Sequence, residues 1–192
     1  MANNLLGARA KLVNIRAGIK QRGVTLMELI AGLAVMAVIV VGALALYNTA
    51  VNSQRATQLK QDTAALRSAV NALWMGQGSF GATPGAPLNQ VLISAGRIPS
   101  TIQVAGTTLR HVGGGTIDVQ VAANVQQFNL IVRGLNESLC IELLSGPQDW
   151  FAIGTAVGAG TPVNIPSPFP ISPAAADTAC VPSNNTITFT GT

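Results

Sequence analysis

The chain has 192 residues, of which 48% are apolar and only 9% are charged, whereas charged residues make up about 25% of a typical soluble domain. Disordered chains are poor in apolar residues and rich in charge, so this composition excludes a disordered protein. Two cysteines and a single histidine, His111, are too few for a four-cysteine zinc site or for most histidine-based metal sites. We therefore expect no cofactor.

The formal net charge of +4 is concentrated at the N-terminus. Five of the eleven basic residues lie within the first 22 residues, which contain no acidic residue. From residue 24 onward the chain has six basic and seven acidic side chains. A domain that binds duplex nucleic acid carries a basic face on its folded part, so this distribution argues against sequence-specific binding of nucleic acid.

A membrane-spanning helix is predicted from Leu29 to Tyr47, where nineteen successive residues carry no charge. As a helix this segment is about 28 Å long, close to the hydrocarbon thickness of a bilayer. The basic residues upstream are expected to hold the N-terminus in the cytoplasm, which places the rest of the chain outside. The segment is longer than the apolar part of a secretory signal, and no small-residue cleavage pattern follows it.

Glu28 stands at the entrance to this apolar segment, five residues after Gly23, and two interpretations of it are open. An acid in the first turn of a helix interacts favourably with the helix macrodipole. Alternatively, the acid awaits a positively charged partner in apolar surroundings. Cleavage after Gly23 would create such a partner, because the new α-amine of Val24 is a cation at neutral pH. That amine can pair with Glu28 of a neighbouring helix and so set the register between subunits.

The segment from Arg22 to Glu28 (RGVTLME), followed by an apolar run, resembles the class III signal of type IV prepilins. The resemblance implies that a membrane prepilin peptidase cleaves between Gly23 and Val24 and methylates the new N-terminus at Val24. Residues 1–23 would then be a leader peptide, and residues 24–50 would be the transmembrane and fibre-core helix. The length of the leader and the valine after the cleavage site are more similar to type IVb than to type IVa pilins.

The helix is expected to continue to residue 75, because no proline interrupts it and Gly76 follows. Between positions 51 and 74 apolar residues recur at three- and four-residue steps, which is typical of an amphipathic helix. The other, polar side of this half is predicted to carry Arg55, Lys60, Asp62 and Arg67. Many type IVa pilins have a proline in the apolar half; here it has none, so Gly42 is the predicted site of any local unwinding during assembly.

Residues 51–192 are predicted to form the amphipathic half of the helix and a globular head, with an overall α+β fold in which the long helix packs on an antiparallel sheet. Local patterns favour strands at residues 108–112, 116–121, 128–132 and 186–190, and helices at 88–95 and 137–144. Asn136 is expected to cap the second of these helices. Gly113 to Gly115 most simply form a hairpin turn, and the Pro-rich stretch 160–173 is expected to be a loop.

Cys140 and Cys180 are expected to form a disulfide, because a protein exported across the membrane enters an oxidising compartment. The bridge would close a loop of about 40 residues and would stabilise the head by roughly 4 kcal/mol in the chain-entropy model. Two buried, reduced thiols are the alternative. In type IV pilins a C-terminal disulfide bounds an exposed, variable D-region, so the resemblance places that region at residues 140–180.

Enzymatic chemistry is not expected. His111 and the glycines that follow Val112 faintly resemble the oxyanion loop of esterases, but the accompanying nucleophile elbow is missing. The acidic residues of the head have neither the spacing of a glycosidase pair nor that of a calcium loop. Trp74, Trp150 and Phe151 are expected to contact the core or a neighbouring subunit.

The resemblance implies a structural protein, the major subunit of a type IVb-like pilus that serves adhesion, aggregation or conjugation. It implies assembly into a homopolymer, together with a prepilin peptidase, an assembly ATPase, a platform protein and a secretin. The chain would reside in the inner membrane as a prepilin and then in the extracellular pilus. A minor pilin or a type II secretion pseudopilin has the same N-terminal features and is an alternative. A membrane-anchored binding module or enzyme is a more distant one.

Overall fold

The computed structural model describes residues 25–146, 149–166 and 168–192. The chain divides into two compact units, one ending at Leu44 and the other beginning at Ala45, and each is described by itself. Helix α1 (Leu26–Leu73) begins in the first unit and ends in the second. It ends two residues before the predicted position, because the chain turns there: the amide of Gln77 donates to the carbonyl of Trp74 at 2.9 Å.

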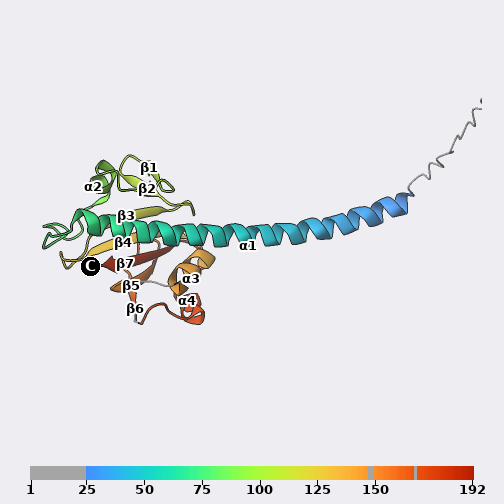
Figure 1. Ribbon diagram of the computed structural model, residues 1–192. Helices are drawn as coiled ribbons and strands as arrows, with labels where there is room; N and C mark the ends of the chain where they lie inside the picture. The colour runs from blue at the N-terminus through green and yellow to red at the C-terminus, as the bar shows by residue number, and fades with distance from the viewer. Residues whose placement is uncertain (1–24, 147–148, 167) are drawn as a thin grey trace, which may run out of the picture. The chain divides into compact units, whose positions relative to one another are not determined.

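Within the described residues, the second unit contains a seven-stranded sheet and three short helices in addition to α1 (Figure 1). The strands are β1 (Gln103–Ala105), β2 (Thr108–Arg110), β3 (Thr116–Val121), β4 (Phe128–Leu135), β5 (Ala152–Val157), β6 (Val163–Ile165) and β7 (Asn185–Gly191). The helices are α2 (Asn89–Ser94), α3 (Glu137–Ser145) and α4 (Pro173–Ala179). The strand order is β1-β2-β3-β4-β7-β5-β6, and every neighbouring pair is antiparallel. The predicted α+β class is confirmed.

The hydrophobic core of this unit lies between the second half of α1 and the sheet. Leu59 and Leu66 of α1 are fully buried and belong to the same cluster as Ile117 and Val119 of β3. Buried residues alternate with half-buried ones along β3, as the two-residue period of a strand requires. Each aliphatic side chain buried in this way contributes about 1.5–3 kcal/mol, so these contacts hold the second half of α1 on the sheet.

Four elements were not predicted: β1, β5, β6 and α4. Both β1 and β6 have only three residues, and neither contains a buried position, so they lack the alternation that signals a strand. The prediction of a loop at residues 160–173 is wrong in part, because β6 lies inside this stretch and α4 begins at its last residue. Helix α4 does have a recognisable start. Ser172 accepts a hydrogen bond from the amide of Ala175 at 3.3 Å, and Pro173 occupies the first helical position, a combination typical of helix N-termini.

Candidate assembly site

The first half of α1 presents an uncovered apolar surface. Its large apolar side chains from Leu26 to Tyr47 are between 53% and 80% exposed. The most apolar 18-residue window has a mean hydropathy of 2.8, and none of it is buried. By length and composition the helix is therefore able to cross a membrane, and this surface requires a cover of lipid or protein.

Glu28 lies in the first turn of α1, and Thr25 caps that turn. The amide of Glu28 lies 3.0 Å from the carbonyl oxygen of Thr25 and 3.3 Å from its Oγ1. Glu28 is exposed, and among the described residues its carboxylate makes no ion pair. Gly23 and Val24 lie outside the described residues, so the pairing of Glu28 with the Val24 amine stays a prediction.

Gly42 lies within the uninterrupted part of α1. A Cβ added there would meet no heavy atom within 4 Å, so packing within the chain does not require a glycine at this position. Local unwinding at Gly42 during assembly stays a prediction.

The disulfide between Cys140 and Cys180 is present, with the two Cα atoms 6.0 Å apart. It joins α3 to the C-terminal end of α4, and both cysteines are buried. The predicted cap of α3 is also found, since the side chain of Asn136 accepts a hydrogen bond from the amide of Leu139 at 2.9 Å. The described part of the segment enclosed by the bridge contains β5, β6 and α4.

The prediction that Asp62 faces solvent is wrong, because only 2% of this residue is exposed. Its Oδ1 accepts hydrogen bonds from Nε2 of Gln58 and from Oγ1 of Thr101, in the segment between α2 and β1. Its Oδ2 is also buried and has no hydrogen-bond partner among the described residues. Ala65 is one of the apolar residues whose spacing predicted an amphipathic helix, but it is exposed. The segment that contains Thr101 therefore covers a side of α1 that the charge pattern predicted to be exposed to solvent.

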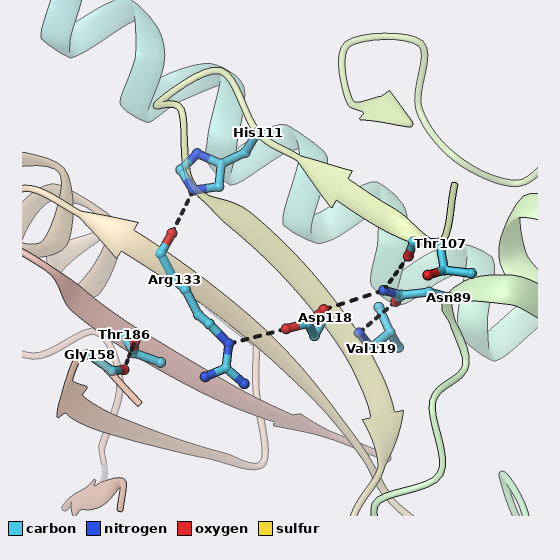
Figure 2. Close-up of polar contacts among 8 residues, drawn as sticks. All are labelled: Asn89, Thr107, His111, Asp118, Val119, Arg133, Gly158 and Thr186. Carbon is cyan, nitrogen blue, oxygen red and sulfur yellow. Dashed lines mark hydrogen bonds and ion pairs between the residues drawn. The ribbon is translucent and has the colours of Figure 1, made fainter. Parts of the chain in front are cut away.

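A polar network connects α2, β3 and β4 (Figure 2). Asn89 of α2 accepts a hydrogen bond from the amide of Val119 at 2.8 Å, and its Nδ2 lies 3.5 Å from Oδ1 of Asp118. The other carboxylate oxygen of Asp118 lies 3.1 Å from Nε of Arg133. Charged and polar groups of three elements thus satisfy one another on the sheet, and the network links α2 to β3 and β3 to β4.

His111 is buried beside this network, in the turn between β2 and β3. Its Nδ1 accepts a hydrogen bond from the amide of Gly113 at 3.1 Å, so its Nε2 carries the proton and donates to the carbonyl of Arg133 at 3.0 Å. Burial lowers the pKa of His111, while the hydrogen bond to Arg133 and the negative charge of Asp62 oppose that shift. The ring is thus held in its neutral form, and it supports the turn predicted at Gly113 to Gly115.

The aromatic residues predicted to contact the core or a neighbouring subunit differ in their exposure. The guanidinium of Arg67 lies 5.1 Å from the centre of the Trp150 ring, and its Nη1 lies 3.3 Å from the Asp149 carboxylate. Trp74 and Trp150 are half-buried and pack against the core, as expected. Phe151 is 65% exposed and remains available for contact with another molecule.

Similarity to known proteins covers most of the chain. A family model described as PilS N terminal matches residues 53–192. The chain is 30% identical over 164 residues to the toxin coregulated pilin of Vibrio cholerae, which covers 82% of this chain and 72% of that protein. The chain belongs to the PilS family of type IV pilins. It is a structural pilus subunit of the type IVb-like kind.

The pilin fold is shared with a solved structure. The crystal structure of TcpA, a type IV pilin from the Vibrio cholerae El Tor biotype, matches with a TM-score of 0.55. The match covers 72% of this pilin and 99% of that chain at 15% sequence identity, so it demonstrates the common fold of the head.

Two residues that hold the head of this pilin were missed by the sequence analysis. Asn89 links α2 to β3, and Asn185 accepts from the amide of Val181 at 2.8 Å and donates to the carbonyl of Leu135 at 3.2 Å. Both asparagines are at most 6% exposed. Val119 is 30 residues from Asn89, and Leu135 is 50 residues from Asn185, so a local pattern could not have identified these two links.

Proposed function

We propose that this pilin is the major subunit of a type IVb-like pilus, and that it polymerises from a membrane pool after removal of residues 1–23. The observation that supports this most strongly is the contrast between the two halves of α1. The second half packs on the sheet, whereas every large apolar side chain from Leu26 to Tyr47 is at least 53% exposed. The same surface on other subunits can replace lipid as its cover.

The proposed assembly step depends on Glu28. Cleavage between Gly23 and Val24, followed by N-methylation, leaves a cationic amine on Val24. This amine pairs with the exposed carboxylate of Glu28 in a neighbouring subunit, because a charge in an apolar helix bundle is strongly disfavoured without a partner. The pair therefore fixes the axial position of each incoming helix, and Gly42 allows the bundle to unwind α1 locally.

The proposal includes the partners and the location that this mechanism needs. The prepilin resides in the inner membrane, where a prepilin peptidase processes it. An assembly ATPase and a platform protein drive polymerisation, and a secretin passes the growing filament to the cell surface. The pilin acts by forming a homopolymer and not by catalysis.

The substitution Glu28→Gln tests the proposal, because it removes the charge and preserves the shape of the side chain. We expect unchanged membrane levels and unchanged leader removal, but loss of the filaments that shearing releases from the cell surface. Glu142→Gln is the matched control, because this carboxylate of the head makes only a long contact of 3.8 Å with Lys60. Normal filament yield from Glu28→Gln would contradict the proposed pairing.

A further inference from the structure

A cavity of about 460 Å³ lies between the second half of α1, the C-terminal part of α3 and the segment before β5. Its volume falls in the range of about 300–1,000 Å³ that is typical of small-molecule sites. Lys60, Arg67 and Asn71 line it from α1, and Trp150 lines it from the segment before β5. Positions 60, 67 and 71 are seven and four residues apart, so one side of the helix carries all three. The cavity therefore combines charged, polar and aromatic side chains of one head.

The side chain of Arg67 is held in this cavity, but one of its donors is unused. Its guanidinium carbon lies 5.1 Å from the centre of the Trp150 ring, and its Nη1 lies 3.3 Å from Oδ2 of Asp149. Its Nε is buried and has no hydrogen-bond partner among the described residues. A buried donor without a partner is unfavourable, and more so when the group is charged. The fixed guanidinium thus leaves an N–H available to an acceptor on another molecule.

Asn71 contributes an unused acceptor, one helical turn after Arg67. Its Nδ2 lies 3.4 Å from the carbonyl oxygen of Thr192, which assigns the nitrogen and the oxygen of the amide. Its Oδ1 is buried and has no hydrogen-bond partner in the described part of the chain. Only a group that carries a hydrogen, such as a hydroxyl, can satisfy this oxygen. A molecule that fits the cavity must therefore bring a donor as well as an acceptor.

The cations of the cavity are only weakly neutralised by the protein itself. The side chain of Asp149, the partner of Arg67, is fully exposed to solvent. Nζ of Lys60 lies 3.8 Å from the Glu142 carboxylate, which is a long contact for an ion pair. Ion pairs with an exposed partner contribute little free energy. Both cations are therefore able to bind an anionic group that enters the cavity.

We propose that this cavity binds a small carboxylate that also carries hydroxyl groups, the class of molecule to which acidic sugars belong. The carboxylate accepts from Nε of Arg67, and Lys60 supplies a second positive charge. A hydroxyl of the ligand donates to Oδ1 of Asn71. Thr63 and Ser68 also line the cavity, and their hydroxyls pair with further hydroxyls of the ligand. The site lies within one head, so the inference goes beyond the proposed function and does not require polymerisation.

Binding of glucuronate to the full-length pilin tests the site. Isotope-labelled pilin in micelles of a non-ionic detergent without a sugar headgroup is titrated and followed by NMR of its two tryptophan indoles. The indole signal of Trp150 should shift and saturate, whereas that of Trp74, which does not line the cavity, should shift less. Glucose lacks the carboxylate and acetate lacks the hydroxyls. Each should therefore bind at least about tenfold more weakly than glucuronate.

Two substitutions distinguish the roles of the lining residues. Arg67→Lys keeps a positive charge but removes the Nε donor, so glucuronate should bind at least about tenfold more weakly. Asn71→Leu removes the unused acceptor, so the preference for glucuronate over acetate should be lost. Arg55→Gln is the matched control, because Arg55 is an exposed cation of the same helix that does not line the cavity. Urea midpoints verify that the head of each variant is folded.

The outcomes bear on this proposal separately from the proposed function. Absence of a saturable shift at Trp150, equally strong binding of glucose or acetate, or unchanged binding to Arg67→Lys would each overturn the site. Retained preference for glucuronate in folded Asn71→Leu would overturn the role of its amide oxygen. All of these measurements use unassembled pilin, whereas the proposed function is tested by the filament yield of Glu28→Gln.

Discussion

Removal of the disulfide should lower the free energy of unfolding of the head, and the size of the loss measures how strongly the bridge stabilises it. The double substitution Cys140→Ala with Cys180→Ala is suitable, because the cysteines are 0% and 6% exposed and alanine introduces no polar group into the core. The bridge spans a sequence separation of 40 residues, for which the chain-entropy relation gives a loss of about 4 kcal/mol at 25 °C. Lost packing of the two sulfur atoms adds to this figure.

The assay is urea unfolding of the purified pilin in detergent micelles, followed by circular dichroism at several wavelengths. Reduction of the unsubstituted protein separates the two contributions, because it opens the loop but keeps both sulfur atoms. Reductant should therefore lower the free energy of unfolding of the unsubstituted pilin by about 4 kcal/mol and leave the alanine variant unchanged. A loss below about 1 kcal/mol on reduction would refute the reasoning, since it would mean that the native contacts alone restrict the enclosed segment.

Three further substitutions probe other parts of the head. His111→Gln should weaken the pH dependence of stability. Because burial lowers the pKa of His111 from 6.5, the stability that the neutral ring contributes is complete above pH 6.5 and is lost as the pH falls through the lower folded-state pKa. Urea midpoints at successive pH values will detect this change. Gly115→Ala should strongly destabilise the head, because a Cβ there overlaps a backbone carbonyl of β4. Gly114→Asn should cost less, because a Cβ at Gly114 has open space and its φ of +88° is one that asparagine tolerates. Equal losses of stability in urea unfolding would contradict this difference. Leu66→Ala should cost about 2–5 kcal/mol in the same assay, and the exposed neighbour Ala65→Ser should stay within about 0.5 kcal/mol of the unsubstituted protein.

Features that depend on residues close in sequence were predictable. The two-residue alternation of Ile117, Val119 and Val121 identified β3 to the residue. Asn136 marked the start of α3, because a cap and the turn that it closes lie within four residues of each other. The long apolar segment and its continuation as an amphipathic helix were likewise readable from local periodicity.

Features that depend on residues distant in sequence were not predictable. Asp62 looks like a solvent-facing charge on its own helix, and only the segment that contains Thr101, 39 residues later, buries it. Asn185 acquires its role because the chain returns beside Leu135, 50 residues earlier. The short edge strand β6 owes its conformation to pairing with β5, since its own residues carry no buried face. In each case a partner distant in sequence determines the environment of the residue, and the local sequence pattern gives no information about that partner.

The intact mass of the pilin in filaments sheared from the cell surface tests the central claim most directly. The account predicts a single species that begins at Val24, carries one methyl group on its N-terminal amine and retains the disulfide between Cys140 and Cys180. A filament protein that still contains residues 1–23 would contradict the account, because the Val24 amine that pairs with Glu28 would then not exist.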